Sequence, residues 1–248
     1  MLKTERRKII LERLDEVLKP LGYEREISFG NVTYTRFDKE SCDYFFLNFT
    51  TSFVTMRYLG HGLIEIESLM SEIIGNRELS SFNNKSSIRT TFTDPTFSGG
   101  GDFADGDDFS MKAKSWCGLD TPEIVHLYCD WLTNYFTHEY PMIVEHYSYL
   151  PNILQKMNEL DAKKIAWGNI VSEGILCGGF PDLCGLLISK LCNDPFYEEK
   201  FNFWAEDYAK DENEKWLPCF ERFCSIIEHV EPRYNIRGSS VVFWAGKG

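Results

Sequence analysis

The sequence lacks the short motifs that carry most enzyme chemistry. It has no Cys-x-x-Cys pair, so the usual zinc-knuckle and thiol-redox spacings are missing, and it has no Gly-x-Ser-x-Gly elbow for a nucleophilic serine. In "HEYPMIVEH", His138 and His146 are separated by Pro141 and stand too far apart for the zincin motif, which places its two histidines on one helix face. We therefore expect no catalytic residues, no metal site and no cofactor.

Positive charge and long apolar runs are also scarce. The chain has 26 Lys and Arg against 38 Asp and Glu, for a net charge of −12. This balance disfavours nucleic acid and anionic membrane surfaces, because both are bound mainly through Lys and Arg. The chain has no apolar run long enough to span a bilayer, and the amphipathic N-terminus does not resemble a signal peptide. We expect a cytoplasmic protein, in which the eight cysteines are reduced.

What the sequence has in abundance is apolar and aromatic material. Hydrophobic residues make up 43% of the 248 residues, and aromatic residues make up 15%. This is enough for one large domain or two small ones. Since each buried ring removes a large area from water, we expect dense aromatic packing.

The front of the chain predicts a helix followed by a sheet. Apolar residues at helical spacing predict a helix over 4–18, with Thr4 as its N-cap. Short β-branched and aromatic runs then predict an antiparallel meander of four strands, over 23–30, 31–38, 42–50 and 53–60. A helical pattern follows Gly62. Two further strands are expected over 86–94 and 109–116, joined by a long hairpin tip.

The rest of the chain reads as helical. Thr121 and Pro122 are typical of a helix start, and further helical segments are expected over 139–158, 162–176, 182–192, 196–209 and 213–230, with one short strand at 241–244. Because the expected strands come early in the chain and most of the expected helices come late, we expect an α+β fold. It has an N-terminal helix and antiparallel sheet, followed by a mainly helical C-terminal half. We expect three regions, 1–117, 118–235 and a tail over 236–248, with the first two packed as one unit.

The most unusual stretch is the loop "SGGGDFADGDDFS", residues 98–110. Its spacing supplies only one EF-hand ligand, and its aspartates would repel a phosphate. Three interpretations stay open: a weak calcium site, a solvated acidic tip, or an acidic contact for a basic partner in which two aromatic residues act as anchors. The candidate contact residues are Asp102, Phe103, Asp105, Asp107, Asp108 and Phe109.

Histidine and cysteine pairs supply weaker candidates. His61 and Glu65 lie four residues apart near a strand-to-helix junction, where we expect a capping or surface role. His126 shares a helix face with Cys129, but two ligands do not make a metal site. Several cysteines, with Cys184 among them, lie among apolar residues and are expected to pack as small hydrophobic side chains.

The order of segments resembles that of a known group of domains. "LKPLGYERE", "MRYLG" before a helix, a strand ending at "KSW", and "DTPEIVHLYCDWLTNYFTHEYPMIVEHYS" occur in that order. This is similar to bacterial domains of unknown function found among the immunity-like proteins that accompany polymorphic toxins. The resemblance covers roughly residues 5–158. It implies an interaction protein and supplies no catalytic residues.

Charge and resemblance together favour an immunity-like protein without catalytic activity. We expect it to bind a basic protein partner through acidic surface, because opposite charge speeds association. The alternative is a small-ligand-binding protein or enzyme, with an aromatic-lined pocket between the sheet and the helical half.

Overall fold

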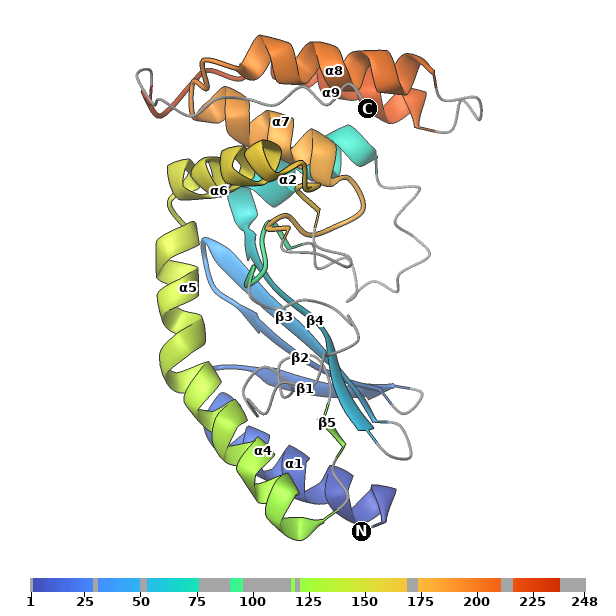
Figure 1. Ribbon diagram of the computed structural model, residues 1–248, viewed down its shortest axis with the longest axis vertical. Helices are drawn as coiled ribbons and strands as arrows, with labels where there is room; N and C mark the ends of the chain where they lie inside the picture. The colour runs from blue at the N-terminus through green and yellow to red at the C-terminus, as the bar shows by residue number, and fades with distance from the viewer. Residues whose placement is uncertain are drawn as a thin grey trace.

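The computed structural model is an α+β fold in which an antiparallel sheet stands between two groups of helices (Figure 1). It describes residues 2–28, 31–49, 53–75, 90–95, 117–118, 121–168, 174–210 and 216–236. Helices α1 (Lys3–Leu18) and α4 (Pro122–Asn134) lie at one end of the molecule, and α8 (Tyr197–Ala209) and α9 (Leu217–Ile227) lie at the other. The expected fold class is confirmed.

The sheet is a meander with the strand order β1-β2-β3-β4-β5, each pair antiparallel. Its strands are β1 (Glu24–Ser28), β2 (Asn31–Phe37), β3 (Ser41–Phe49), β4 (Phe53–Leu63) and β5 (Cys117–Gly118). The four expected strands are therefore confirmed. The turn between β2 and β3 is held by the Asp38 carboxylate, which accepts backbone N–H bonds from Glu40 and Ser41.

The first hydrophobic core lies between one face of the sheet and α1, α4 and the π-helical turn η1 (Tyr135–Glu139). Alternate residues of β3 point into it, since side chains along a strand alternate between faces. The Phe45 ring stacks on Tyr34 at 4.8 Å and on Phe136 at 4.6 Å, which confirms the dense aromatic packing. Thr121 caps α4 as expected, accepting a bond from the Ile124 N–H. Thr4 does not cap α1; Leu2 occupies the N-cap position.

A second hydrophobic core lies among the helices beyond the sheet. It is built from α2 (Ile64–Ile74), α6 (Leu150–Lys163), α7 (Pro181–Leu191) and α9, and α8 packs against it. Helix α5 (Tyr140–Tyr147) connects the two ends along the side of the sheet (Figure 1). The boundary between the cores does not coincide with the expected region boundary at residue 117, because α2 precedes that residue and packs in the second core.

Two expected elements are wrong. The described part of 162–176 is not helical beyond Lys163, where α6 ends because Lys164 adopts a left-handed backbone. The chain then doubles back, and Leu176 donates a backbone bond to the Trp167 carbonyl. In the described part of 86–94, Phe92 forms only isolated bridges, to His61 and to Leu176, instead of a strand. Residues 91–93 link the sheet to the second core, because they exchange backbone hydrogen bonds with His61 of β4 on one side and with Ile175 and Cys177 on the other.

Several expectations concern residues outside the described ranges. They are the strand at 241–244, the strand at 109–116 and the acidic loop at 98–110. Within the described ranges, every helix is too short or too polar to cross a lipid bilayer.

Candidate functional site

A cleft of about 670 Å³ lies at the helical end of the molecule. Its volume falls within the range of small-ligand and side-chain binding sites. The start of α7, one face of α8 and the segments before α7 and α9 form its walls. We call it the aromatic cleft, because five of its lining residues carry rings: Trp167, Phe180, Trp204, Tyr208 and Trp216.

Local sequence explains how these rings converge. Trp204 and Tyr208 are four residues apart on α8, so they lie on one face of that helix. Phe180 immediately precedes Pro181, which opens α7, and Trp216 immediately precedes α9. The ring centroids of Phe180 and Trp216 are 5.0 Å apart in an edge-to-face arrangement. The rings are thus held by helix ends and by one another, which gives the cleft fixed walls.

Two carboxylates and one ammonium group share the cleft with the rings. Asp182 is half-buried and accepts a hydrogen bond from the Tyr208 hydroxyl. Burial raises the pKa of Asp182 above its usual value, although this hydrogen bond acts in the opposite direction. Asp207 is exposed. Lys210 is also exposed and lies 3.9 Å from Glu206, so its charge is partly balanced outside the cleft. The cleft therefore combines apolar walls with negative charge.

The Trp167 ring packs against a buried ionic cluster that consists of Lys200, Asn158, Asp161 and Asp194. Its indole Nε1 donates to Asp161 Oδ1 at 2.8 Å. The Lys200 ammonium lies 5.6 Å from the centre of the same ring and donates to Asp194 at 2.8 Å and to Asn158 at 2.5 Å. Lys200 is completely buried, which requires such partners. This arrangement fixes the wall of the cleft and shows that Trp167 already accepts a cation.

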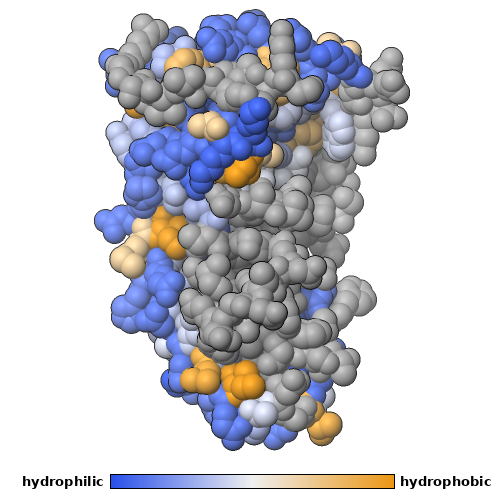
Figure 2. All heavy atoms as spheres, viewed as in Figure 1, coloured by the Kyte–Doolittle hydropathy of each residue, from blue (hydrophilic) through white to orange (hydrophobic). Residues whose placement is uncertain are grey.

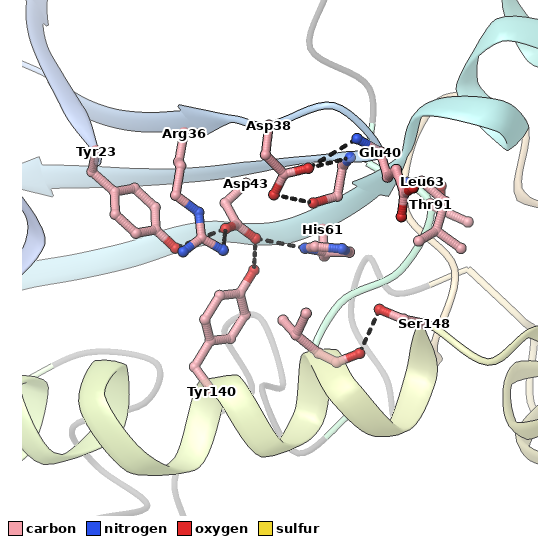
Figure 3. A network of polar contacts seen from close by, with 12 residues as sticks. Tyr23, Arg36, Asp38, Glu40, Asp43, His61, Leu63, Thr91, Tyr140 and Ser148 are labelled. Atoms are coloured by element: carbon pink, nitrogen blue, oxygen red, sulfur yellow. Dashed lines mark hydrogen bonds and ion pairs between the residues drawn. The ribbon is translucent and has the colours of Figure 1, made fainter. Parts of the chain in front are cut away.

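A second polar cluster lies between the sheet and α5, shown in Figure 3. Its centre is Asp43 on β3, whose carboxylate accepts bonds from the Tyr23 hydroxyl at 2.9 Å and the Tyr140 hydroxyl at 2.8 Å. His61 Nδ1 lies 2.7 Å from the same carboxylate and Arg36 lies 2.6 Å from it. We call these five residues the Asp43 network.

The Asp43 network contains an Asp–His pair like that of a catalytic dyad, but the pair is buried. Burial raises the pKa of Asp43, yet the hydrogen bond from His61 and the charge of Arg36 outweigh burial, so the net pKa is lowered. Asp43 is 1% exposed and His61 is 2% exposed, so no substrate atom reaches the pair. The arrangement ties three strands to α5.

The structure corrects two expectations about individual residues. His61 was expected at the surface or at a helix cap, but it is buried in the Asp43 network. Its expected companion Glu65 pairs instead with Arg233. The pocket of the alternative hypothesis was expected between the two halves, whereas the aromatic cleft lies within the helical half.

Other candidates lie elsewhere in the molecule. His126 is exposed and Cys129 is buried, and both line a groove between α1 and α4. Cys177 and Cys184 are buried, and burial raises the pKa of the Cys184 thiol well above its usual value, which disfavours a nucleophilic thiolate. Within the described ranges, no three His, Cys, Asp or Glu side chains gather in a way that would hold a metal ion.

The six loop residues expected to contact a partner, Asp102, Phe103, Asp105, Asp107, Asp108 and Phe109, lie outside the described residues. Sequence reasoning missed the Asp43 network and the complete aromatic cleft. A signal for the first existed, because Asp43 falls on the apolar face of β3 together with Phe45 and Leu47. For the second, the stripe of Trp204 and Tyr208 was visible, whereas Trp167 and Trp216 come from distant segments.

No protein-family model, curated protein or solved structure matches this chain.

Proposed function

We propose that this chain is an acidic interaction protein that binds a basic protein partner through the helical half, without catalysing a reaction. The observation that carries the proposal is the uneven distribution of charge. Residues 64–75 and 148–236, which include α2 and α6 to α9, contain 18 acidic and 9 basic residues, a net charge of −9, whereas residues 1–63 and 121–147, which include α1, β1 to β4, α4 and α5, contain 13 and 10, a net charge of −3. Most of the net charge of −12 therefore belongs to the helical half.

The charge of the helical half is displayed at the surface. Figure 2 shows hydrophilic residues over much of the described surface of this end of the molecule. Seven carboxylates on α8, on α9 and in the segment after α9 are exposed: Glu198, Glu199, Glu206, Asp207, Glu221, Glu228 and Glu231. Such a surface attracts a basic protein over roughly the Debye length, about 10 Å at 0.1 M salt, and speeds its association. It repels nucleic acid for the same reason.

Two further parts of the proposal rest on the chain's chemistry. Seven cysteines of the described residues are reduced, which suits a reducing bacterial cytoplasm: Cys42, Cys129, Cys177, Cys184, Cys192, Cys219 and Cys224. The immunity-like role implied by the order of segments suits an acidic binder, because a toxin that acts on nucleic acid would bind it through Lys and Arg. The loop residues Asp102 to Phe109 remain a predicted part of the contact.

The test is a binding experiment with a defined basic probe. Fluorescein-labelled nona-arginine is titrated with the full chain, and anisotropy and stopped-flow association rates are measured at about 50 and about 200 mM salt. We expect saturable binding whose association rate falls as salt rises. An association rate indifferent to salt contradicts electrostatic steering.

Paired variants locate the surface. The first carries Glu206→Gln, Glu221→Gln, Glu228→Gln and Glu231→Gln, and the second carries Glu5→Gln, Glu24→Gln, Glu26→Gln and Glu40→Gln; all eight side chains are exposed. Both variants remove four negative charges, so only position differs. We expect the first to weaken probe binding about tenfold and the second less than twofold. Equal effects of the two variants would refute a localised surface.

A second function is favoured by one observation, the aromatic cleft. A cleft of this volume with apolar walls and a few polar groups also suits a small ligand. A thermal-shift screen with metabolites and metal ions tests this alternative, because a ligand that prefers the native state raises the melting temperature. A shift produced by a neutral or anionic metabolite would favour it over protein binding.

A further inference from the structure

We infer that the aromatic cleft receives an arginine side chain of the basic partner, together with the short stretch of backbone that carries it. The inference rests on the proposed function and names the contact at its centre. It is carried by the meeting of five rings and two carboxylates in one cleft, on the half of the chain that holds most of the negative charge.

The chemistry of the cleft favours a cation. Aromatic faces attract cations within about 6 Å of the ring centre, and Asp182 and Asp207 provide opposite charge beside the rings. The chain already shows this combination once, because the buried Lys200 ammonium lies against the Trp167 ring and is paired with Asp194. The one cation among the described lining residues, Lys210, points its charge toward Glu206 at 3.9 Å.

The shape of the cleft favours arginine over lysine. A guanidinium is planar, stacks on aromatic faces and donates two parallel hydrogen bonds to a carboxylate, whereas an ammonium is a compact and strongly hydrated charge. The walls are rings, and Asp207 is exposed and accessible as an acceptor. The volume of about 670 Å³ leaves space for the residues that flank the arginine.

The rim of the cleft has the character of a protein contact. Trp216 is 38% exposed, although a tryptophan gains from burial. Exposed tryptophans beside charged groups are typical of the residues that dominate binding energy at interfaces, and arginine is typical of their partners. A bound partner would cover this ring as well as fill the cleft.

Gly179 offers a way to close the cleft without altering its charge. It lines the cleft, and a Cβ atom built on it meets no atom within 4 Å. Its backbone does not adopt the left-handed conformation of the neighbouring Gly178, so a side chain there is not strained. A leucine at this position therefore adds bulk at the lining of the cleft, and its Cβ overlaps no neighbouring atom.

The experiment follows the indole resonances of the full-length chain by NMR while nona-arginine is added. The Nε1–H signals of Trp204 and Trp216, assigned with single Trp→Phe variants, report on the cleft, and the signal of Trp131 on α4 is the internal reference. We expect the two cleft signals to shift while the Trp131 signal stays constant. Nona-lysine is expected to produce smaller shifts and to bind at least threefold more weakly.

The key comparison is Gly179→Leu against Asn202→Leu, which adds the same side chain on an exposed position of α8 that does not line the cleft. We expect Gly179→Leu to abolish the indole shifts and to weaken nona-arginine binding at least fivefold, and Asn202→Leu to leave both unchanged. Thermal unfolding checks that each variant is folded. Asp207→Asn changes an exposed side chain and gives an independent test, in which we expect the affinity for nona-arginine to fall about threefold.

The outcomes separate this inference from the function on which it rests. If Gly179→Leu and Asp207→Asn bind as the parent does, while the variant lacking Glu206, Glu221, Glu228 and Glu231 binds weakly, the cleft is not the contact and the acidic surface is. Equal binding of nona-lysine and nona-arginine overturns the assignment to arginine. If nona-arginine does not bind at all, both proposals fail.

Discussion

The two halves of the molecule each bury a carboxylate beside a cation, and the two carboxylates behave in opposite ways. Asp43 in the sheet half accepts from two tyrosine hydroxyls, His61 and Arg36, and its pKa is lowered despite burial. Asp161 in the helical half accepts one bond from Trp167, and burial, only partly offset by Lys200, raises its pKa to about 6.

The difference comes from how the donors are distributed. All four donors of the Asp43 network converge on one carboxylate, whereas the Lys200 ammonium lies 2.8 Å from Asp194 and 3.8 Å from Asp161. Burial alone therefore does not decide the charge state of a carboxylate; the number of donors that reach it does. In the sheet half the Asp43 network is buried. In the helical half the ionic cluster around Lys200 contacts Trp167, which lines the open aromatic cleft.

The largest expected effect comes from breaking the Asp43 network. Asp43→Asn removes the charge that compensates Arg36 and replaces one acceptor by a donor facing hydroxyl and imidazole groups. We expect a loss of about 3–5 kcal/mol in the free energy of unfolding, as for other buried ion pairs that lose one partner. Urea unfolding followed by circular dichroism measures it.

The matched control is Tyr140→Phe, which removes a single donor and leaves the other three in place. The expected loss is about 1 kcal/mol, the net contribution of one hydrogen bond. If Asp43→Asn costs no more than Tyr140→Phe, the carboxylate is not the centre of the network, and the contrast drawn with Asp161 loses its basis.

A smaller effect is expected where the helical half packs around the cleft wall. A Cβ atom at Gly185 of α7 would overlap the Trp167 ring and lie 2.9 Å from Met157 Cε. Gly185→Ala gains up to about 1 kcal/mol in helix propensity, but overpacking costs about 1–3 kcal/mol. Because the neighbours are themselves packed, we expect net destabilisation of about 1 kcal/mol in urea unfolding.

Gly179→Ala is the control for this change. It adds the same methyl group in the same half, but into open space, so its expected effect on stability is within about 0.5 kcal/mol. If both variants are destabilised, the surroundings of Gly179 are as tightly packed as those of Gly185. That result would contradict the difference in packing between the two positions.

The sequence predicts much of the fold because its signals are local. Period-two alternation in β2 and β3 and the cap at Thr121 depend on neighbouring residues, and they are confirmed. The helix expected over 162–176 is wrong because this segment pairs with a residue far away in sequence: Leu176 forms a bridge with Phe92. Periodicity cannot report such pairings.

The candidate site is less predictable than the fold for the same reason. Trp204 and Tyr208 form a stripe that sequence shows, but Trp167 reaches the cleft only because its indole is bonded to Asp161 and supported by Lys200. His61 shows the converse, since its local position suggested the surface, whereas it lies against Asp43 and Phe92, which are both remote from it in sequence. Long-range polar contacts, rather than local pattern, assemble both clusters.

The smallest expected effect is a difference in pH dependence between the two carboxylates. The pKa of folded Asp161, about 6, lies above its unfolded value of 3.8, so the folded state binds this proton more tightly and its contribution to stability is lost as pH rises from about 4 to about 6. For Asp43 the pKa is lowered, so its contribution is present above about pH 4 and lost as pH falls.

Urea unfolding at about pH 4.5 and 6.5 compares the parent with Asp161→Asn. We compare how much the free energy of unfolding changes between the two pH values in the parent and in the variant. Since water reaches part of Asp161, we expect these two changes to differ by only about 1–2 kcal/mol. Asp207→Asn, at an exposed carboxylate, should retain the parent's slope; if Asp161→Asn also retains it, Asp161 is ionised throughout this range and Lys200 compensates both of its neighbouring carboxylates.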